Sequence, residues 1–102
     1  RICEGIIRAS HRNPDLPPTN IEPGKIYRYN IDLWATSNVF KKGHRIRLEI
    51  SSSNFPRFDR NLNTGTFFAT ETNWVKAEQR IFHGPDYPSC IILPVITSSA
   101  AR

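Results

Sequence analysis

The chain has 102 residues, a mass of 11.7 kDa and a formal net charge of +5. This length fits one domain, and it is too short for a complete α/β-hydrolase or for a Rossmann enzyme with its partner domain. Its 38% hydrophobic and 23% charged residues are typical of a globular chain and argue against wholesale disorder. The longest apolar run, residues 90–96, is far shorter than the roughly 20 residues of a membrane span, so we expect no membrane partner.

Neither the N-terminus nor the cysteines identify a cellular compartment. The chain begins with Arg1 and has no charged-then-apolar leader, which predicts a processed, excised or incomplete polypeptide. Cys3 and Cys90 lie near opposite ends and form no C-x-x-C, which favours two free buried thiols over a zinc or thioredoxin-like site. A disulfide between them would require an oxidising compartment, so cytoplasmic and secreted locations both stay open.

Short apolar stretches between turn residues predict an all-β fold. The clearest strand covers residues 26–34, where apolar and polar side chains alternate as a half-buried strand requires. It follows Glu22-Pro23-Gly24-Lys25, a predicted turn in which Pro fixes φ at the second position and Gly supplies a positive φ at the third.

A second strand is predicted over residues 45–52, with Ile46, Leu48 and Ile50 on one face. Lys41-Lys42-Gly43 predicts a tight turn before it. Further strands are expected over residues 5–10, 79–83 and 90–96. The last of these is apolar on both faces, like a strand in the middle of a sandwich.

Three segments do not follow the strand pattern. Residues 11–20 contain Pro14, Pro17 and Pro18 and predict an extended loop. Residues 70–77 predict a short helical turn. Residues 54–66 form a long loop without periodicity, and a structureless loop of this length in a small domain tends to be functional.

The sequence contains no recognisable catalytic or metal-binding constellation. A nucleophile elbow needs Gly-x-Ser-x-Gly, and no glycine of this chain has a serine two residues later. His11, His44 and His83 are isolated in sequence, without the i, i+4 spacing that places two imidazoles around a metal. We therefore expect no catalytic residue, no cofactor and no metal in this segment.

A sequence pI of about 9.7 raises the question of nucleic-acid binding. The basic residues that would form such a face, and the phenylalanines that would stack on bases, are Arg8, Arg12, Lys41, Lys42, Arg45, Arg47, Arg57, Arg60, Phe55, Phe58, Phe67 and Phe68. No nucleic-acid-binding signature accompanies them, and Arg45 and Arg47 alternate with predicted core positions. We therefore prefer a solvated strand face or the charged rim of a protein interface.

The loop over residues 54–65 interleaves arginines with aromatic residues, a composition enriched at the buried centre of protein interfaces. Its Asn and Asp side chains can satisfy backbone groups inside an irregular loop. Two interpretations stay open: a rigid docking loop that packs on another domain, or an internally hydrogen-bonded Ω-loop without a partner. The domain-interface candidates are Asn54, Phe55, Arg57, Phe58, Asp59 and Arg60.

Around this loop the sequence resembles a known family. The central run is Gly43-His44-Arg45-Ile46-Arg47-Leu48-Glu49-Ile50-Ser51-Ser52-Ser53-Asn54-Phe55-Pro56-Arg57-Phe58-Asp59-Arg60-Asn61, and it continues through Asn63-Thr64-Gly65. Other matching pieces follow in order: Gly5-Ile6-Ile7-Arg8-Ala9, Pro23-Gly24-Lys25-Ile26-Tyr27, Ile31-Asp32-Leu33-Trp34-Ala35-Thr36-Ser37, Gln79-Arg80-Ile81-Phe82-His83, Tyr87-Pro88-Ser89 and Leu93-Pro94-Val95. Over nearly the whole chain they resemble the C-terminal, non-catalytic domain of the X-Pro dipeptidyl-peptidase and cocaine-esterase-like (CocE/NonD) serine hydrolases.

The resemblance implies a jelly-roll β-sandwich of the galactose-binding-like kind, in agreement with the strand prediction. In that family the Ser-His-Asp triad belongs to a separate α/β-hydrolase domain that precedes this one, so no catalytic residue is carried over. The resemblance also implies an accessory domain that packs beside the catalytic domain of the same parent chain and helps to form the oligomer. Residues 54–61 are its candidate docking surface.

The sequence departs from the family pattern at its start, because the strands that open the family's jelly roll before the segment matching residues 5–9 are absent. We therefore expect residues 1–102 to be the C-terminal half of that domain, a partial jelly roll with open apolar faces and edges. Alone, it should be marginally stable or self-associating. The parent would hydrolyse esters or amides, X-Pro peptides among them, with an activated serine. The alternative is a stand-alone β-sandwich module that binds carbohydrate or nucleic acid.

Overall fold

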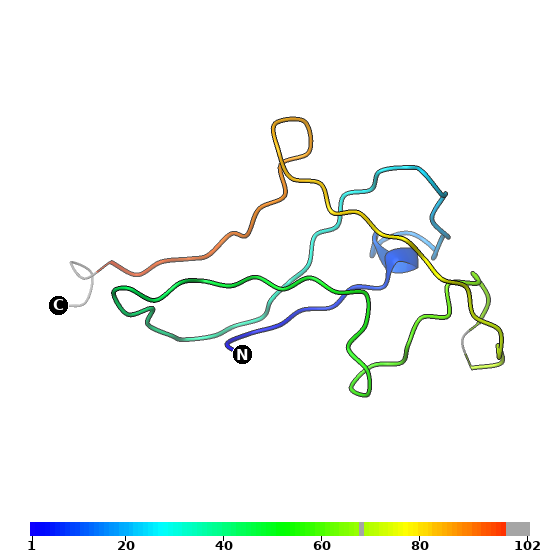
Figure 1. Cartoon of the computed structure of the whole chain (residues 1–102), viewed down its shortest axis with the longest axis horizontal. Helices are drawn as coiled ribbons and strands as arrows, with labels where there is room; N and C mark the ends of the chain where they lie inside the picture. The colour runs from blue at the N-terminus through cyan, green and yellow to red at the C-terminus, as the bar shows by residue number, and fades with distance from the viewer. Residues whose placement is uncertain (68, 98–102) are drawn as a thin grey trace.

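A computed structural model of the chain describes residues 1–67 and 69–97. In that range it contains one regular element, the 3₁₀ helix η1, Ala9–His11, and no β-strand. The other described residues form extended segments joined by turns (Figure 1). The jelly-roll β-sandwich expected from the sequence therefore stays a prediction.

The chain is elongated and open. Its principal extents are 56 × 34 × 30 Å, and its radius of gyration is 17.3 Å, against about 13 Å for a compact domain of this length. Its accessible surface is 10324 Å², which is about 4,400 Å² more than a compact monomer of the same mass exposes. Within the described ranges no residue is buried, so these residues close no core of their own.

Two glycine turns form where the sequence predicts them. In the turn at residues 22–25, the Lys25 N–H donates to the Glu22 carbonyl at 3.2 Å, and Gly24 has a φ of 81°. The second turn has a Gly43 φ of 83° and is closed by a backbone hydrogen bond of 3.0 Å from His44 to Lys41. A positive φ at the third turn position favours glycine, which has no Cβ to clash. Both turn predictions are confirmed.

The N-terminal segment, residues 1–8, runs antiparallel to residues 31–36. A Cβ added at Gly5 would lie 2.1 Å from the Asp32 carbonyl oxygen, so the two backbones are in direct contact there. Near its start, the Ile2 carbonyl accepts a long hydrogen bond of 3.5 Å from Thr36 Oγ1. Gly5 meets Asp32 and Ile2 meets Thr36, so the two segments run in opposite directions. A side chain at position 5 would push the two segments apart.

Residues 62–66 and 71–75 also lie antiparallel. The Val75 N–H donates to the Leu62 carbonyl at 2.9 Å, and Thr66 Oγ1 donates to the Glu71 carboxylate at 2.9 Å. The helical turn predicted over residues 70–77 is therefore wrong, because Val75 bonds across to a separate segment instead of to the preceding helical turn. The β-branched and aromatic pair Trp74-Val75 favours this extended course.

The proline-containing segment 11–20 folds back on itself. The Thr19 N–H donates to the Ser10 carbonyl at 3.0 Å, and the Arg12 guanidinium donates to the carbonyls of Ala9 and Thr19 at 3.0 and 2.8 Å. The same guanidinium lies 4.6 Å from the ring centre of Tyr27. The loop predicted here is confirmed, but its extended course is wrong because Arg12 closes the segment. The helix η1 also takes Ala9 and Ser10 from the strand predicted over residues 5–10.

The apolar face predicted for residues 45–52 is open to water. Ile46, Leu48 and Ile50 are each more than half exposed, and residues 90–96 are also exposed along their length. Both cysteines are free; Cys3 is half-buried and Cys90 is exposed, so the burial predicted for Cys90 is wrong. The described residues therefore do not cover these apolar positions.

Candidate docking surface

Glu4 holds the first part of the loop at residues 54–60 against the N-terminal segment. Its carboxylate forms ion pairs with the guanidinium groups of Arg57 and Arg1, and it accepts a hydrogen bond of 3.5 Å from Asn54 Nδ2. The Glu4 side chain is 25% exposed, whereas that of Arg57 is 61% exposed. A half-buried carboxylate therefore positions two of the predicted interface residues from the inner side of the loop.

The aromatic residues of this loop are presented on its outer side. Phe55 is 71% exposed and Phe58 is 37% exposed. The Arg57 guanidinium lies 5.5 Å from the Phe58 ring centre, a favourable cation–π distance. Backbone hydrogen bonds fix the loop, from the Phe55 N–H to Ser53 Oγ at 3.3 Å and from the Phe58 N–H to the Asn54 carbonyl at 3.2 Å. Phe55 is thus an apolar side chain held outward by an ordered backbone.

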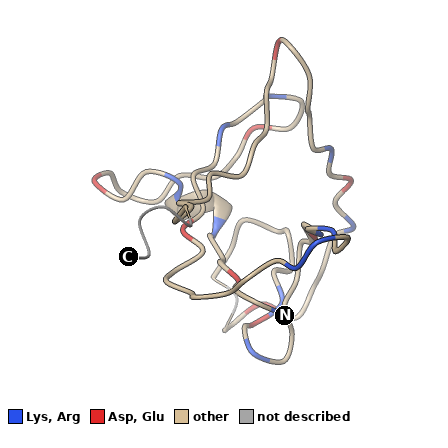
Figure 2. Cartoon of the chain, turned by 90° about the vertical axis from the view of Figure 1, so that its left-hand side faces the viewer, with Lys and Arg blue, Asp and Glu red and all other residues tan. Residues whose placement is uncertain are grey.

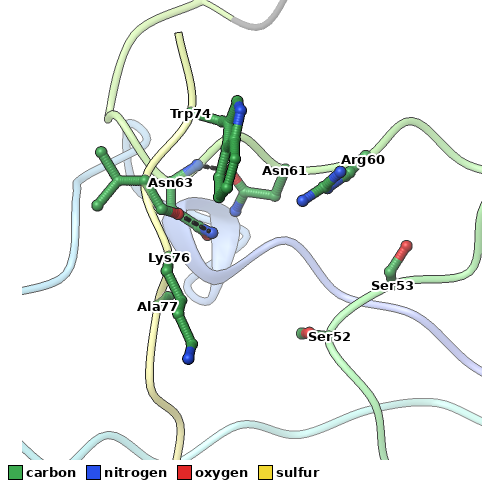
Figure 3. Close-up of a pocket in the computed structure, with 9 residues that line it drawn as sticks. Ser52, Ser53, Arg60, Asn61, Asn63, Trp74, Lys76 and Ala77 are labelled. Atoms are coloured by element: carbon green, nitrogen blue, oxygen red, sulfur yellow. Dashed lines mark hydrogen bonds between the residues drawn. The ribbon is translucent and has the colours of Figure 1, made fainter.

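Arg60 lies in a different place from the rest of the loop. Its guanidinium lies 5.6 Å from the ring centre of Trp74, and both residues line a hollow of about 170 Å³ (Figure 3). Asp59 lies next to Arg60 in the chain and forms no ion pair with the described residues. Of the six predicted interface residues, Asn54 and Arg57 contact Glu4, Phe58 lies beside Arg57, and Arg60 alone lines this hollow.

The hollow brings polar and cationic side chains together around one tryptophan. Asn61 Oδ1 accepts a hydrogen bond of 3.0 Å from the Asn63 N–H, and Asn63 Nδ2 donates to the Val75 carbonyl at 3.0 Å. Asn63 has a φ of 60°, a left-handed conformation that Asn adopts more readily than most residues. The residues that line the hollow are Ser52, Ser53, Arg60, Asn61, Asn63, Trp74, Val75, Lys76 and Ala77.

Sequence reasoning missed Glu4, Trp74 and Lys76. Trp74 carried a usable signal, because a lone tryptophan in a polar stretch is a common interface residue. It was placed instead in a predicted helical turn. Glu4 carries no such signal, since its role depends on the antiparallel approach of distant segments.

A second hollow, of about 330 Å³, lies within the loop at residues 82–87. The rings of Phe82 and Tyr87 lie 5.5 Å apart at 55° to each other, and the Ser89 N–H donates to the Tyr87 carbonyl at 2.9 Å. His83 lies in this loop. All the lining residues belong to one turn, so the hollow is the inside of a single loop and joins no separate segments.

Two exposed charged groups have shifted pKa values. The hydrogen bond and ion pair between Lys25 Nζ and Glu22 Oε1, at 3.0 Å, raise the pKa of Lys25. The Asn73 N–H, and after it the Thr66 hydroxyl, stabilise the Glu71 carboxylate and lower its pKa. Both groups lie outside residues 54–60, so they stabilise local turns and leave the docking loop unaffected.

The basic residues lie along several separate segments of the chain (Figure 2). Arg47 is paired with Glu49 at 3.6 Å and Arg57 with Glu4, so part of the proposed basic face is already neutralised. Phe68, one of the proposed stacking residues, lies outside the described residues. This distribution of basic residues does not support nucleic-acid binding.

The described residues offer neither a metal site nor a membrane-spanning helix. Among residues 1–67 and 69–97, no group of three His, Cys, Asp or Glu side chains is placed to hold a metal ion. A helix long and apolar enough to cross a membrane does not occur in these ranges. His11 has a local partner, because its Nδ1 lies 3.0 Å from Ser10 Oγ.

Comparison with known proteins shows that the chain is a non-catalytic accessory domain of a hydrolase family. Residues 1–92 match the family described as the X-Pro dipeptidyl-peptidase C-terminal non-catalytic domain. The chain belongs to this family, which confirms the resemblance found in the sequence. It is also 50% identical over 97 residues to the cocaine esterase of Rhodococcus sp. (strain MB1 Bresler). No solved structure matches the chain significantly.

The alignment with the cocaine esterase covers the two proteins very unequally. It includes 93% of this chain and 17% of that protein. The relative is therefore a much longer polypeptide in which the matched part is one small portion.

Proposed function

We propose that this chain is a scaffold part of a serine hydrolase of the acyl-esterase or X-Pro dipeptidyl-peptidase type, and that it packs on the α/β-hydrolase catalytic domain. The family match over residues 1–92 is the observation that carries the proposal. The long cocaine esterase relative, of which the chain covers 17%, supports a polypeptide with room for a separate catalytic domain.

The open surface of the chain supports contact with large neighbours. Its excess of about 4,400 Å² over a compact monomer is larger than the roughly 1,200–2,000 Å² that a standard protein interface buries in total. Each square ångström of apolar surface covered stabilises by about 25 cal/mol. We propose two covering neighbours: further strands of a jelly-roll β-sandwich, and the catalytic domain.

The loop at residues 54–60 is the proposed contact with the catalytic domain. Phe55 is exposed and apolar, and Arg57 is already held by Glu4. A contact loop that is ordered before it binds loses less conformational entropy on association. The two features together favour a docking role over a purely internal Ω-loop.

Arg57→Ala tests this role in a polypeptide that carries the chain together with its catalytic domain. We expect a lower Tm or a lower kcat/KM, because the substitution frees the loop from Glu4. The pH profile of the serine chemistry should be unchanged, since the triad lies elsewhere. Arg80→Ala is the matched control, because the Arg80 side chain is 77% exposed and pairs with the equally exposed, local Glu78. Unchanged Tm and kcat/KM in Arg57→Ala would refute the docking role.

The exposed Trp74 and the polar residues beside it are the observation that favours one alternative, a stand-alone β-sandwich module that binds carbohydrate or nucleic acid on its open surface. The reading frame upstream of Arg1 separates the two functions. A Gly-x-Ser-x-Gly segment between a strand and a helix in that frame supports the accessory domain. A native chain that starts near Arg1 supports the stand-alone module.

A further inference from the structure

The hollow beside Trp74 has an excess of positive charge. Arg60 and Lys76 both line it, and no Asp or Glu does. Neither cation forms an ion pair with any carboxylate in the part of the chain that the structure describes. Within residues 1–67 and 69–97, ion pairs are instead formed by Arg1, Arg47, Arg57 and Arg80. The two cations therefore have unused capacity to pair with an anion.

The neutral groups around these cations add hydrogen-bond donors. The oxygen of the Asn61 carboxamide is occupied by the Asn63 N–H, which leaves the NH₂ group of Asn61 available to an acceptor. The Ser52 hydroxyl also lines the hollow and has no acceptor among the described residues. Figure 3 shows Arg60, Asn61 and Ser52 on the lining of this same hollow. A group of donors that contains two cations and no acid is suited to a carboxylate.

Trp74 makes Arg60 a better partner for such a carboxylate. The ring lies 5.6 Å from the guanidinium carbon and is 63% exposed, so it supports one side of the cation. A guanidinium binds a carboxylate through two parallel N–H donors along an edge. Trp and Arg are also the residue types most often found to dominate binding energy at protein interfaces.

The size and setting of the hollow favour a side chain over a free ligand. Its volume of about 170 Å³ is below the roughly 300–1,000 Å³ of pockets that enclose small molecules. Exposed apolar residues lie close to it in the chain, Phe55 before it and Val75 within its lining. A net charge of +5 also favours an acidic partner.

We propose that this hollow is a carboxylate socket, and that its occupant is an Asp or Glu side chain of the catalytic domain. The inference rests on the proposed function, because it names the chemistry by which the accessory domain holds its neighbour. Arg60 would bind the carboxylate through its guanidinium edge. Lys76 would supply the second charge, and Asn61 a neutral hydrogen bond.

Zero-length cross-linking tests the socket in the polypeptide that carries this chain and its catalytic domain. A water-soluble carbodiimide activates a carboxylate, and a lysine amine in contact with it then displaces the carbodiimide as a urea and forms an amide. We expect peptide mapping to find Lys76 joined to one Asp or Glu of the catalytic domain. Lys76→Arg is the matched variant, because it keeps the positive charge and should keep the Tm while the cross-link disappears. Arg60→Gln should lower the cross-link yield about tenfold through loss of a charge-assisted contact.

The outcomes separate the socket from the proposed function. If Lys25, Lys41 or Lys42 cross-links to the catalytic domain and Lys76 does not, the socket is overturned and the packing of the two domains survives. If no lysine of this chain cross-links to the catalytic domain, the socket is overturned; residues 54–60 contain no lysine, so the Arg57→Ala measurement then decides whether the packing fails as well. Calorimetric titration with acetate is the second arm. Saturable acetate binding that Arg60→Gln abolishes, without a Lys76 cross-link, would assign the hollow to free carboxylates and overturn the domain partner.

Discussion

Glu4→Gln should release the loop at residues 54–60 from the N-terminal segment. Glutamine keeps the shape of the side chain but removes the charge that pairs with Arg57 and Arg1. It also keeps an oxygen that can accept the hydrogen bond from Asn54 Nδ2. The substitution therefore isolates the contribution of the charge from that of the packing.

The expected loss follows from the exposure of the three side chains. Glu4 is 25% exposed, whereas Arg57 and Arg1 are 61% and 66% exposed. Fully exposed ion pairs contribute about 0.2–1 kcal/mol each, and a partly buried carboxylate places these pairs toward the upper end. Two pairs on one carboxylate then amount to about 1–2 kcal/mol of the free energy of unfolding.

Urea unfolding of the polypeptide that carries this chain with its catalytic domain measures this loss. It should shrink between low and high salt, because the screening length falls from about 10 Å at 0.1 M to about 3 Å at 1 M ionic strength. Glu78→Gln is the control, since Glu78 pairs with Arg80 at 3.4 Å and both side chains are highly exposed. An equal effect of the two substitutions, or a loss that does not depend on salt, would refute the assignment of Glu4 as the anchor of the loop.

Three further predictions concern the fold. Gly5→Ala should destabilise the same polypeptide by more than about 2 kcal/mol in urea unfolding, because its Cβ would lie 2.1 Å from the Asp32 carbonyl oxygen; Gly24→Ala, with open space around a φ of 81°, should cost about 1 kcal/mol, and the reverse order would contradict the close approach at Gly5. The Glu71 pKa, followed by carboxyl NMR, should lie below its ordinary value, so the stabilisation is present above the ordinary pKa and is lost as pH falls through the lowered one. Thr66→Val should raise that pKa, and an unchanged titration would exclude the hydrogen bond. The isolated chain of 102 residues should self-associate or unfold without cooperativity; light scattering and calorimetry that find a monodisperse, cooperatively melting monomer would contradict the partial sandwich.

The features that sequence reasoning predicted well are those that a few neighbouring residues determine locally. Gly24 and Gly43 follow short turn sequences, and each adopts the positive φ that its turn requires. A turn of this kind depends on four neighbouring residues and needs no distant partner. The free thiol groups of Cys3 and Cys90 likewise followed from their spacing and the absence of C-x-x-C.

The features that it missed depend on segments that meet from far apart in the chain. Periodicity predicts which residues share a face, but it does not say which distant carboxylate will meet Arg57. Arg12 closes the proline-containing loop through carbonyl groups, and carbonyl groups carry no sequence signal. Trp74 was missed as well, because its contact with Arg60 depends on the antiparallel approach of residues 62–66 and 71–75.

This chain combines ordered contacts between polar side chains with apolar side chains that are exposed to water. The Glu4–Arg57 contact and the Arg12 contacts are made within the chain, whereas Ile46, Leu48 and Ile50 stay open to water. Ion pairs this exposed contribute too little to offset the conformational entropy of a whole domain, so the proposed neighbours would have to supply the hydrophobic burial. A chain stabilised in this way has an apparent stability set by its binding to those neighbours. Substitutions on the apolar face should then change association, whereas substitutions at Glu4 should change the local order of the loop.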